Sequence, residues 1–254
     1  MNQFFSFKRF TLLVLKHWAD NKKRYGLAIL ALIGLLTIRF LFHILIADDN
    51  DSFNDVQPTT FFFSLFVVGT FYASQYFRDL GSKAKAGNFL SVPASTFEKL
   101  LCSLVYSVLL FTAVFTAAFY LVNILMLALS NEIFAEDRMQ KSGIINVFKI
   151  GFFILREDLR INGLLFFMAI QSVFLFGSVY FKRYSFLKTI ISGFIIYFFL
   201  FGLTYIFCRP LFPGDSTEAR LPQWIEQAFG ILVMYVIAPL LWTLTYYRLK
   251  RKQV

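Results

Sequence analysis

The chain contains few of the residues from which catalytic and metal sites are built. Among its 254 residues there are two histidines, His17 and His43, and two cysteines. It has no H-E-x-x-H motif, no Cys-x-x-Cys motif and no pair of acidic residues within an apolar stretch. Acid–base catalysis requires titratable groups within hydrogen-bond reach of each other. The sequence therefore predicts neither a metal site nor an enzyme.

A phosphate-binding loop is also missing. No segment matches G-x-x-x-x-G-K-[ST], the motif whose backbone N–H groups and lysine hold nucleotide phosphates. The chain is thus expected to contain no cofactor of its own, and any ATP that it depends on must be bound by another chain.

Charge is scarce, and long apolar stretches take its place. Charged residues make up 16% of the chain and hydrophobic residues 58%, whereas a soluble domain of this length keeps a more charged surface. A helix needs about 20 apolar residues to cross a bilayer. Stretches of this kind are found at Gly26–Ile46, Thr59–Phe77, Leu100–Leu129, Ile161–Phe181, Ser185–Cys208 and Trp224–Tyr246. The predicted fold class is all-α, a polytopic membrane protein in which residues 1–254 form one transmembrane domain of six helices.

The distribution of lysine and arginine predicts the orientation, because these residues are retained on the cytoplasmic side. They concentrate before the first stretch, between the second and third, between the fourth and fifth, and in the C-terminal tail. The loop at 47–58 has none of them and four aspartates. We therefore expect both termini in the cytoplasm and the chain in a bacterial inner membrane. The net charge of +10 favours contact with anionic lipids, while the scatter of the basic residues argues against nucleic acid.

Two segments are expected to lie along the membrane surface. Residues 1–25 mix aromatic and basic residues, which is typical of an interfacial helix in the inner headgroup layer. Ile144–Leu155 is apolar but too short to span the bilayer. It is predicted to be an interfacial or re-entrant helix on the outer face.

Apart from Lys188, close to the basic start of the fifth stretch, Arg39 and Glu226 are the only charged residues within the apolar stretches. Because charge near the bilayer centre is costly, ion-coupled transport would need more of it. Two interpretations of Arg39 stay open: it extends to the outer headgroups, or it pairs with Glu226 at the outer mouth of a pathway. Asn123 and Gln171 are predicted to form hydrogen bonds between helices, and Pro239 to kink the last helix.

The connection at 76–101 has the features of a structured element. Two glycines flank a basic patch around Lys83 and Lys85, apolar residues follow, and Pro93 blocks a continuous helix. Ser95 and Glu98 stand at the spacing of a capping box, which starts a new helix. The segment is therefore either a docking site for a cytoplasmic partner or a hairpin that only orients two spans.

Residues Arg78–Leu80 and Asn88–Leu101 resemble the loop between the second and third spans of ABC-2 type exporter permeases. In that family an apolar–proline–serine run followed by a glutamate–lysine pair opens the third span. The number of spans, the N-terminal helix and the length fit the same family. One feature departs from it: the connection at 209–223 is short and rich in proline, where many members have re-entrant outer helices.

This resemblance implies a permease subunit of an ATP-driven exporter. Such subunits pair as homodimers or with a related chain, and each binds a cytoplasmic ATPase subunit. The residues that would couple the chain to the ATPase are Arg78, Asp79, Lys83, Lys85, Phe89 and Glu98. The alternative is a membrane sensor or assembly scaffold without transport, whose partners would lack nucleotide-binding motifs.

Overall fold

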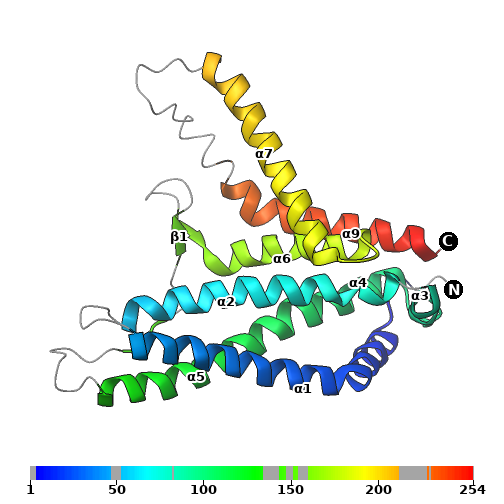
Figure 1. The fold of residues 1–254 in the computed structure, drawn as a ribbon. Coiled ribbons are helices and arrows are strands. Elements are labelled where there is room, and N and C mark those ends of the chain that lie inside the picture. Colours follow the sequence, from blue (N-terminus) through cyan, green and yellow to red (C-terminus); the bar gives the residue numbers. More distant parts are fainter. Residues whose placement is uncertain are drawn as a thin grey trace. The chain divides into compact units, whose positions relative to one another are not determined.

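The computed structural model describes residues 4–46, 53–81, 83–133, 143–146, 151–153, 160–211, 228 and 230–253. The chain divides into two compact units. Unit 1 comprises Met1–Tyr72 and Val92–Ile150, and unit 2 comprises Ala73–Ser91 and Gly151–Val254. Helices dominate both units (Figure 1), so the predicted fold class is confirmed in its main feature.

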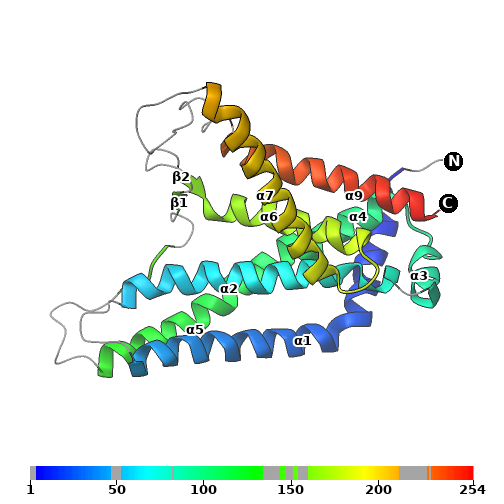
Figure 2. The same ribbon diagram turned by 45° about the horizontal axis from the view of Figure 1, so that its top comes forward.

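Unit 1 is built from three long helical segments. The first is α1 (Phe7–Ile46), and the second is α2 (Phe53–Tyr76), whose last residues belong to unit 2. The third runs through α4 (Thr96–Leu104), the π-helical segment η2 (Val105–Leu110) and α5 (Phe111–Ile133). Helices α1 and α5 lie side by side, as both views show (Figures 1 and 2).

Phenylalanine rings packed edge to face or tilted against one another form the core of unit 1. In α1 the buried residues recur every four positions, at Leu32, Leu36, Phe40 and Ile44, so they occupy one helix face. The Phe61 ring of α2 lies 4.9 Å from that of Phe119 and 5.4 Å from that of Phe115, both in α5. Phe40 approaches Phe119 at 6.0 Å. These aromatic contacts fasten the three helices together.

The predicted interfacial helix and first span are one continuous helix of 40 residues, α1. The helix bends near its N-terminal end, where the darkest blue part turns away from the rest (Figure 1). The aromatic and basic N-terminal sequence is therefore joined to the apolar part without a break in helical structure.

In unit 2, the last residues of α2 are followed by the short 3₁₀-helix η1 (Arg78–Gly81) and the helix α3 (Lys83–Leu90). Its main helices are α6 (Gly163–Tyr180), α7 (Ser185–Leu211) and α9 (Ile237–Gln253), and α6 packs against both of the others. Helix α7 leans away from α6 beyond its first turns (Figures 1 and 2). Consistent with this, every residue from Gly193 to Leu200 is exposed.

The expectation of a short helix at Ile144–Leu155 was wrong. Within this segment, Gly151–Phe153 forms strand β1, which pairs antiparallel with β2 (Arg160–Asn162). Ile144 to Asn146 have no regular structure. Glycine and aromatic residues suit a short antiparallel pair better than a helix. This pair is the exception, among the described residues, to the predicted all-α fold.

Four helices are long and apolar enough to cross a membrane: Phe7–Ile46, Val56–Tyr76, Thr96–Glu132 and Gly163–Tyr180. They correspond to the first four predicted spans and are compatible with a multi-pass membrane protein. In α7 the apolar part found is shorter, Ser185–Leu200, and the start of the sixth predicted stretch lies outside the described residues. Six spans and the orientation of the termini therefore stay predictions.

Pro239 lies in the first turn of α9, directly after the π-helical segment η4 (Leu232–Val236). Proline has no N–H to donate to the carbonyl four residues earlier. A widened π-turn is one way in which a helix adapts to such a missing bond. The predicted distortion near Pro239 therefore takes the form of a change in helical winding.

The contact between α6 and α7 depends on Gly177. A Cβ atom there would collide with the side chain of Thr189, which is buried and donates from Oγ1 to Ser185 O at 2.7 Å. We predict that Gly177→Ala lowers the free energy of unfolding by about 1–3 kcal/mol because of overpacking. The control is Gly193→Ala, at a site with nothing within 4 Å. Thermal unfolding of both purified variants measures the difference, and equal stability would contradict the packing described.

Candidate functional site around Glu98

The start of α4 is built by a capping box, as the sequence predicts. Ser95 has an extended backbone and its Oγ accepts a hydrogen bond from the N–H of Glu98 at 3.1 Å. In return, Glu98 Oε2 accepts one from the N–H of Ser95 at 2.8 Å. Two backbone donors that the helix cannot satisfy itself are thereby paired. The capping box fixes the direction in which α4 leaves the preceding segment.

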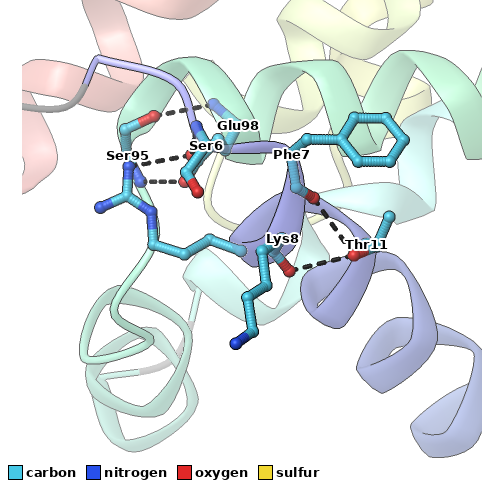
Figure 3. Close-up of polar contacts among 7 residues, drawn as sticks. Ser6, Phe7, Lys8, Thr11, Ser95 and Glu98 are labelled. Atoms are coloured by element: carbon cyan, nitrogen blue, oxygen red, sulfur yellow. Dashed lines mark hydrogen bonds and ion pairs between the residues drawn. The ribbon is translucent and has the colours of Figure 1, made fainter.

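The other carboxylate oxygen of Glu98 binds the N-terminal segment. Glu98 Oε1 accepts hydrogen bonds from the N–H of Ser6 at 2.7 Å and from Arg9 Nη2 at 3.0 Å. Figure 3 shows Ser6, Ser95 and Glu98 close together, with dashed lines marking the polar contacts between them. One side chain thus joins the beginning of α1 to the beginning of α4, across about 90 residues of sequence.

Aromatic rings surround this junction. Phe97, the neighbour of Glu98, stacks on Phe4 with the ring centres 5.0 Å apart. It also meets Phe5 edge to face at 6.2 Å. Rings packed in this way attract one another and add to the hold of the hydrogen bonds on the N-terminal segment.

The burial of Glu98 decides what this residue can do. Its side chain has 0% exposure, whereas that of Arg9 is 38% exposed. A carboxylate is buried at a large cost unless donors surround it, and here Ser6, Ser95 and Arg9 provide three. Glu98 is one of the residues predicted to couple the chain to an ATPase subunit; its side chain has no exposed surface, and the donors that it binds belong to this chain.

A second contact attaches the same half of α1 to the third helical segment. Tyr106, in the π-helical η2, donates from its hydroxyl to Val14 O at 2.8 Å. Its ring lies 4.5 Å from the His17 ring and 5.9 Å from the Tyr25 ring. The Tyr25 hydroxyl is hydrogen-bonded to His17 Nε2 at 2.7 Å. Nothing in the sequence pointed to this cluster or to the π-turn that contains Tyr106.

The other predicted coupling residues belong to unit 2. Arg78 and Asp79 lie in η1, and Arg78 is exposed and donates from Nη1 to Gln75 Oε1 at 3.4 Å. Lys83, Lys85 and Phe89 lie in α3. The Phe89 ring packs edge to face against that of Phe77 at 6.1 Å. The side chains of Asp79, Lys83 and Lys85 are outside the description, and Glu98 belongs to unit 1.

The predicted pair of Arg39 and Glu226 lies only half within the described residues. Arg39 is half-buried in α1, one turn before His43, while Glu226 is outside the description. In the part of the chain that is described, no group of three or more histidine, cysteine, aspartate or glutamate residues could hold a metal ion.

A second buried polar centre lies in unit 1, and its member Asn123 was predicted to bond between helices. Asn123 Nδ2 donates to Gln57 Oε1 at 2.8 Å, which joins α5 to α2, so that prediction is confirmed. Gln57 Nε2 donates to Gly143 O at 2.9 Å, and its Oε1 also accepts from the N–H of Ile145 at 3.3 Å. Gln57 thereby holds the segment Gly143–Asn146 against the helices. Its role was missed because its partners are distant in sequence.

Among known proteins, no family model, curated protein or solved structure matches this chain. The resemblance of residues 78–101 to exporter permeases therefore stays a prediction, which rests on the motif alone.

The Glu98 junction predicts that Glu98→Gln loosens the N-terminal segment. The variant keeps the shape of the side chain, but it removes the charge that Arg9 pairs with and one of the acceptor oxygens. We expect a loss of about 1–3 kcal/mol and faster hydrogen exchange at the amides of Ser6 to Phe10. Hydrogen-exchange mass spectrometry of the purified chain measures this. Glu132→Gln, which neutralises an exposed carboxylate at the far end of α5, is the control and should leave the exchange unchanged.

The hydrogen bonds of Gln57 and Asn123 yield a prediction that compares these two residues. Gln57→Leu removes both oxygen and nitrogen from a site with four hydrogen-bond partners, Asn54, Asn123, Gly143 and Ile145. It should cost about 2–4 kcal/mol, because several buried polar groups lose their bonds at once. Asn123→Leu leaves Gln57 bonded to the loop and should cost less. Thermal unfolding of the two variants tests this order, and the reverse order would contradict it.

Proposed function

We propose that this chain is the membrane-spanning permease subunit of an ATP-driven exporter and works with separate cytoplasmic ATPase subunits. The observation that carries the proposal is the junction at Glu98. The residues that resemble the permease motif build a capped helix start, and that helix start binds the N-terminal segment. A hairpin that only orients two spans would not need this second attachment.

The geometry around Glu98 suits the transmission of force. A displacement at the start of α4 acts on a short, charge-assisted set of hydrogen bonds, and these bonds pull on Ser6 and Arg9. Tyr106 ties α1 to the same helical segment about two turns further along. With two attachments, at Glu98 and at Tyr106, both a translation and a tilt of α4 are passed on to α1. With only one attachment, α1 could rotate about it. The N-terminal part of α1 and the start of α4 therefore move together.

The partner ATPase is proposed to dock on the segment from Arg78 to Phe89. Arg78 is exposed, as are Gly87 and Asn88 in α3. Phe89 is half-buried against Phe77, so it supports the shape of this surface. The proposed roles differ within the predicted coupling set. Arg78, Asp79, Lys83 and Lys85 contact the ATPase, whereas Glu98 transmits the resulting movement to the N-terminal segment.

The remainder of the proposal follows from the sequence. The proposed subunit has six spans, namely the four helices suited to membrane crossing and the two predicted stretches at Ser185–Cys208 and Trp224–Tyr246, with both termini in the cytoplasm of a bacterium. The chain pairs with a second copy or with a related permease. ATP binds to the partner subunit, since this chain has no phosphate-binding loop.

The experiment is to tag the C-terminus, extract the chain in mild detergent from its native membranes and identify partners by mass spectrometry. We expect one soluble subunit with a phosphate-binding loop per chain. Partners without nucleotide-binding motifs would instead favour a sensor or scaffold, and a chain that is extracted alone would contradict the exporter.

A charge reversal tests the docking segment in the same preparation. Arg78→Glu should reduce the recovered ATPase about tenfold, which corresponds to about 1.4 kcal/mol of binding. Lys22→Glu, an equal charge change at an exposed position of α1, is the matched control and should leave recovery unchanged. Equal recovery with both variants would remove Arg78 from the interface.

A further inference from the structure

Three cations meet at the end of helix α6 in unit 2. Lys252 of α9 donates from Nζ to Val179 O, in the last turn of α6, at 2.7 Å. Arg248, one turn earlier in α9, lies over the ring of Tyr180 with its guanidinium carbon 5.0 Å from the ring centre. Lys182 follows two residues after the end of α6. Helix α9 thus brings two positive charges to the point where the chain already carries a third.

The charges of Arg248 and Lys182 are close enough to Lys252 to affect its protonation. Burial lowers the pKa of Lys252, and the charges of Arg248 and Lys182 lower it further. Like charges brought together in a half-buried place cost free energy unless an opposite charge offsets them. The arrangement is therefore expensive for the protein by itself.

The described residues offset only part of this charge. None of the three cations forms an ion pair with an acidic residue of the described ranges. The C-terminal carbonyls of α6 carry a partial charge of about half a unit, which one lysine already engages. Arg248 Nε is buried and has no hydrogen-bond acceptor among the described residues. Within the described residues, part of the positive charge of these three side chains is not neutralised, and Arg248 Nε has no acceptor.

The backbone that carries Lys182 is held firmly in place. A Cβ atom at Gly81 would collide with the carbonyl group of Lys182, so only glycine lets η1 approach this turn so closely. Ser185 donates from Oγ to Ser74 O at 2.7 Å on the other side of the turn. Tyr184 has a φ of 54°, a left-handed conformation that the surrounding contacts must maintain. A turn fixed in this way is preorganised for a ligand.

We propose that Lys182, Arg248 and Lys252 bind the phosphate group of an anionic membrane lipid. A phosphate accepts several hydrogen bonds and supplies the negative charge that these residues lack. Exposed Tyr180, Tyr184 and Leu187 lie next to the cations in sequence and suit the glycerol and acyl parts of a lipid better than they suit a free phosphate ion. This site is independent of the proposed exporter function, since a sensor or a scaffold could contain it equally.

The test uses the full chain in detergent and measures the rise of its unfolding temperature with added ligand. The probes are short-chain phosphatidylglycerol, short-chain phosphatidylcholine and inorganic phosphate, at constant ionic strength. We expect phosphatidylglycerol to stabilise most. Lys182→Gln and Arg248→Gln should each weaken its apparent affinity about tenfold. Lys250→Gln, which removes an exposed charge from the same helix, should leave the affinity within about twofold.

Each outcome decides a separate point. If inorganic phosphate stabilises the chain through the same two residues and phosphatidylglycerol does not, the phosphate site stands but its ligand is soluble. If all three variants weaken phosphatidylglycerol equally, the attraction is diffuse and the proposal is overturned, as it is if no probe binds. Should Arg248→Gln fail to fold, Lys182→Gln decides alone, because that exposed side chain makes no hydrogen bond in the described structure.

Discussion

A buried carboxylate is the interaction on which unit 1 depends at its N-terminal end. Glu98 has no exposed surface, and its charge is acceptable only because Ser6, Ser95 and Arg9 donate to it together. The capping box alone would start α4. The additional bonds to Ser6 and Arg9 fix the place from which α1 begins, and the stacked rings of Phe4 and Phe97 cover the result.

Unit 1 contains two groups of buried polar contacts, and the rest of its core is aromatic packing. Glu98 and Tyr106 attach the N-terminal part of α1, and Gln57 with Asn123 attaches the segment Gly143–Asn146. Between them lies the core of Phe61, Phe115 and Phe119. Apolar burial is non-directional, whereas a hydrogen bond requires a donor–acceptor distance of about 2.7–3.2 Å and a favourable angle. The polar groups therefore set the register of helices whose burial the aromatic side chains supply.

Local features were predictable from the sequence, and contacts between distant segments were not. The capping box needed only the spacing of Ser95 and Glu98, and the apolar lengths indicated the four long helices. The hydrogen bonds from Ser6 and Arg9 to Glu98 depend on how the starts of α1 and α4 pack, so the sequence alone does not predict them. The π-turn at Tyr106 has no sequence signature. The apolar segment after Gly143 was mistaken for a helix, because hydrophobicity alone cannot distinguish a short helix from a paired strand.

The central claim is that the charge of Glu98 binds the N-terminal segment through Arg9, and a double-mutant cycle tests it most directly. The free energies of unfolding of Arg9→Gln, Glu98→Gln and the double variant are compared with that of the unaltered chain. If the two groups interact as described, the double variant is less destabilised than the sum of the single variants, by about 0.5–3 kcal/mol. Additive losses within about 0.3 kcal/mol would show that the two side chains act independently, and would contradict the account.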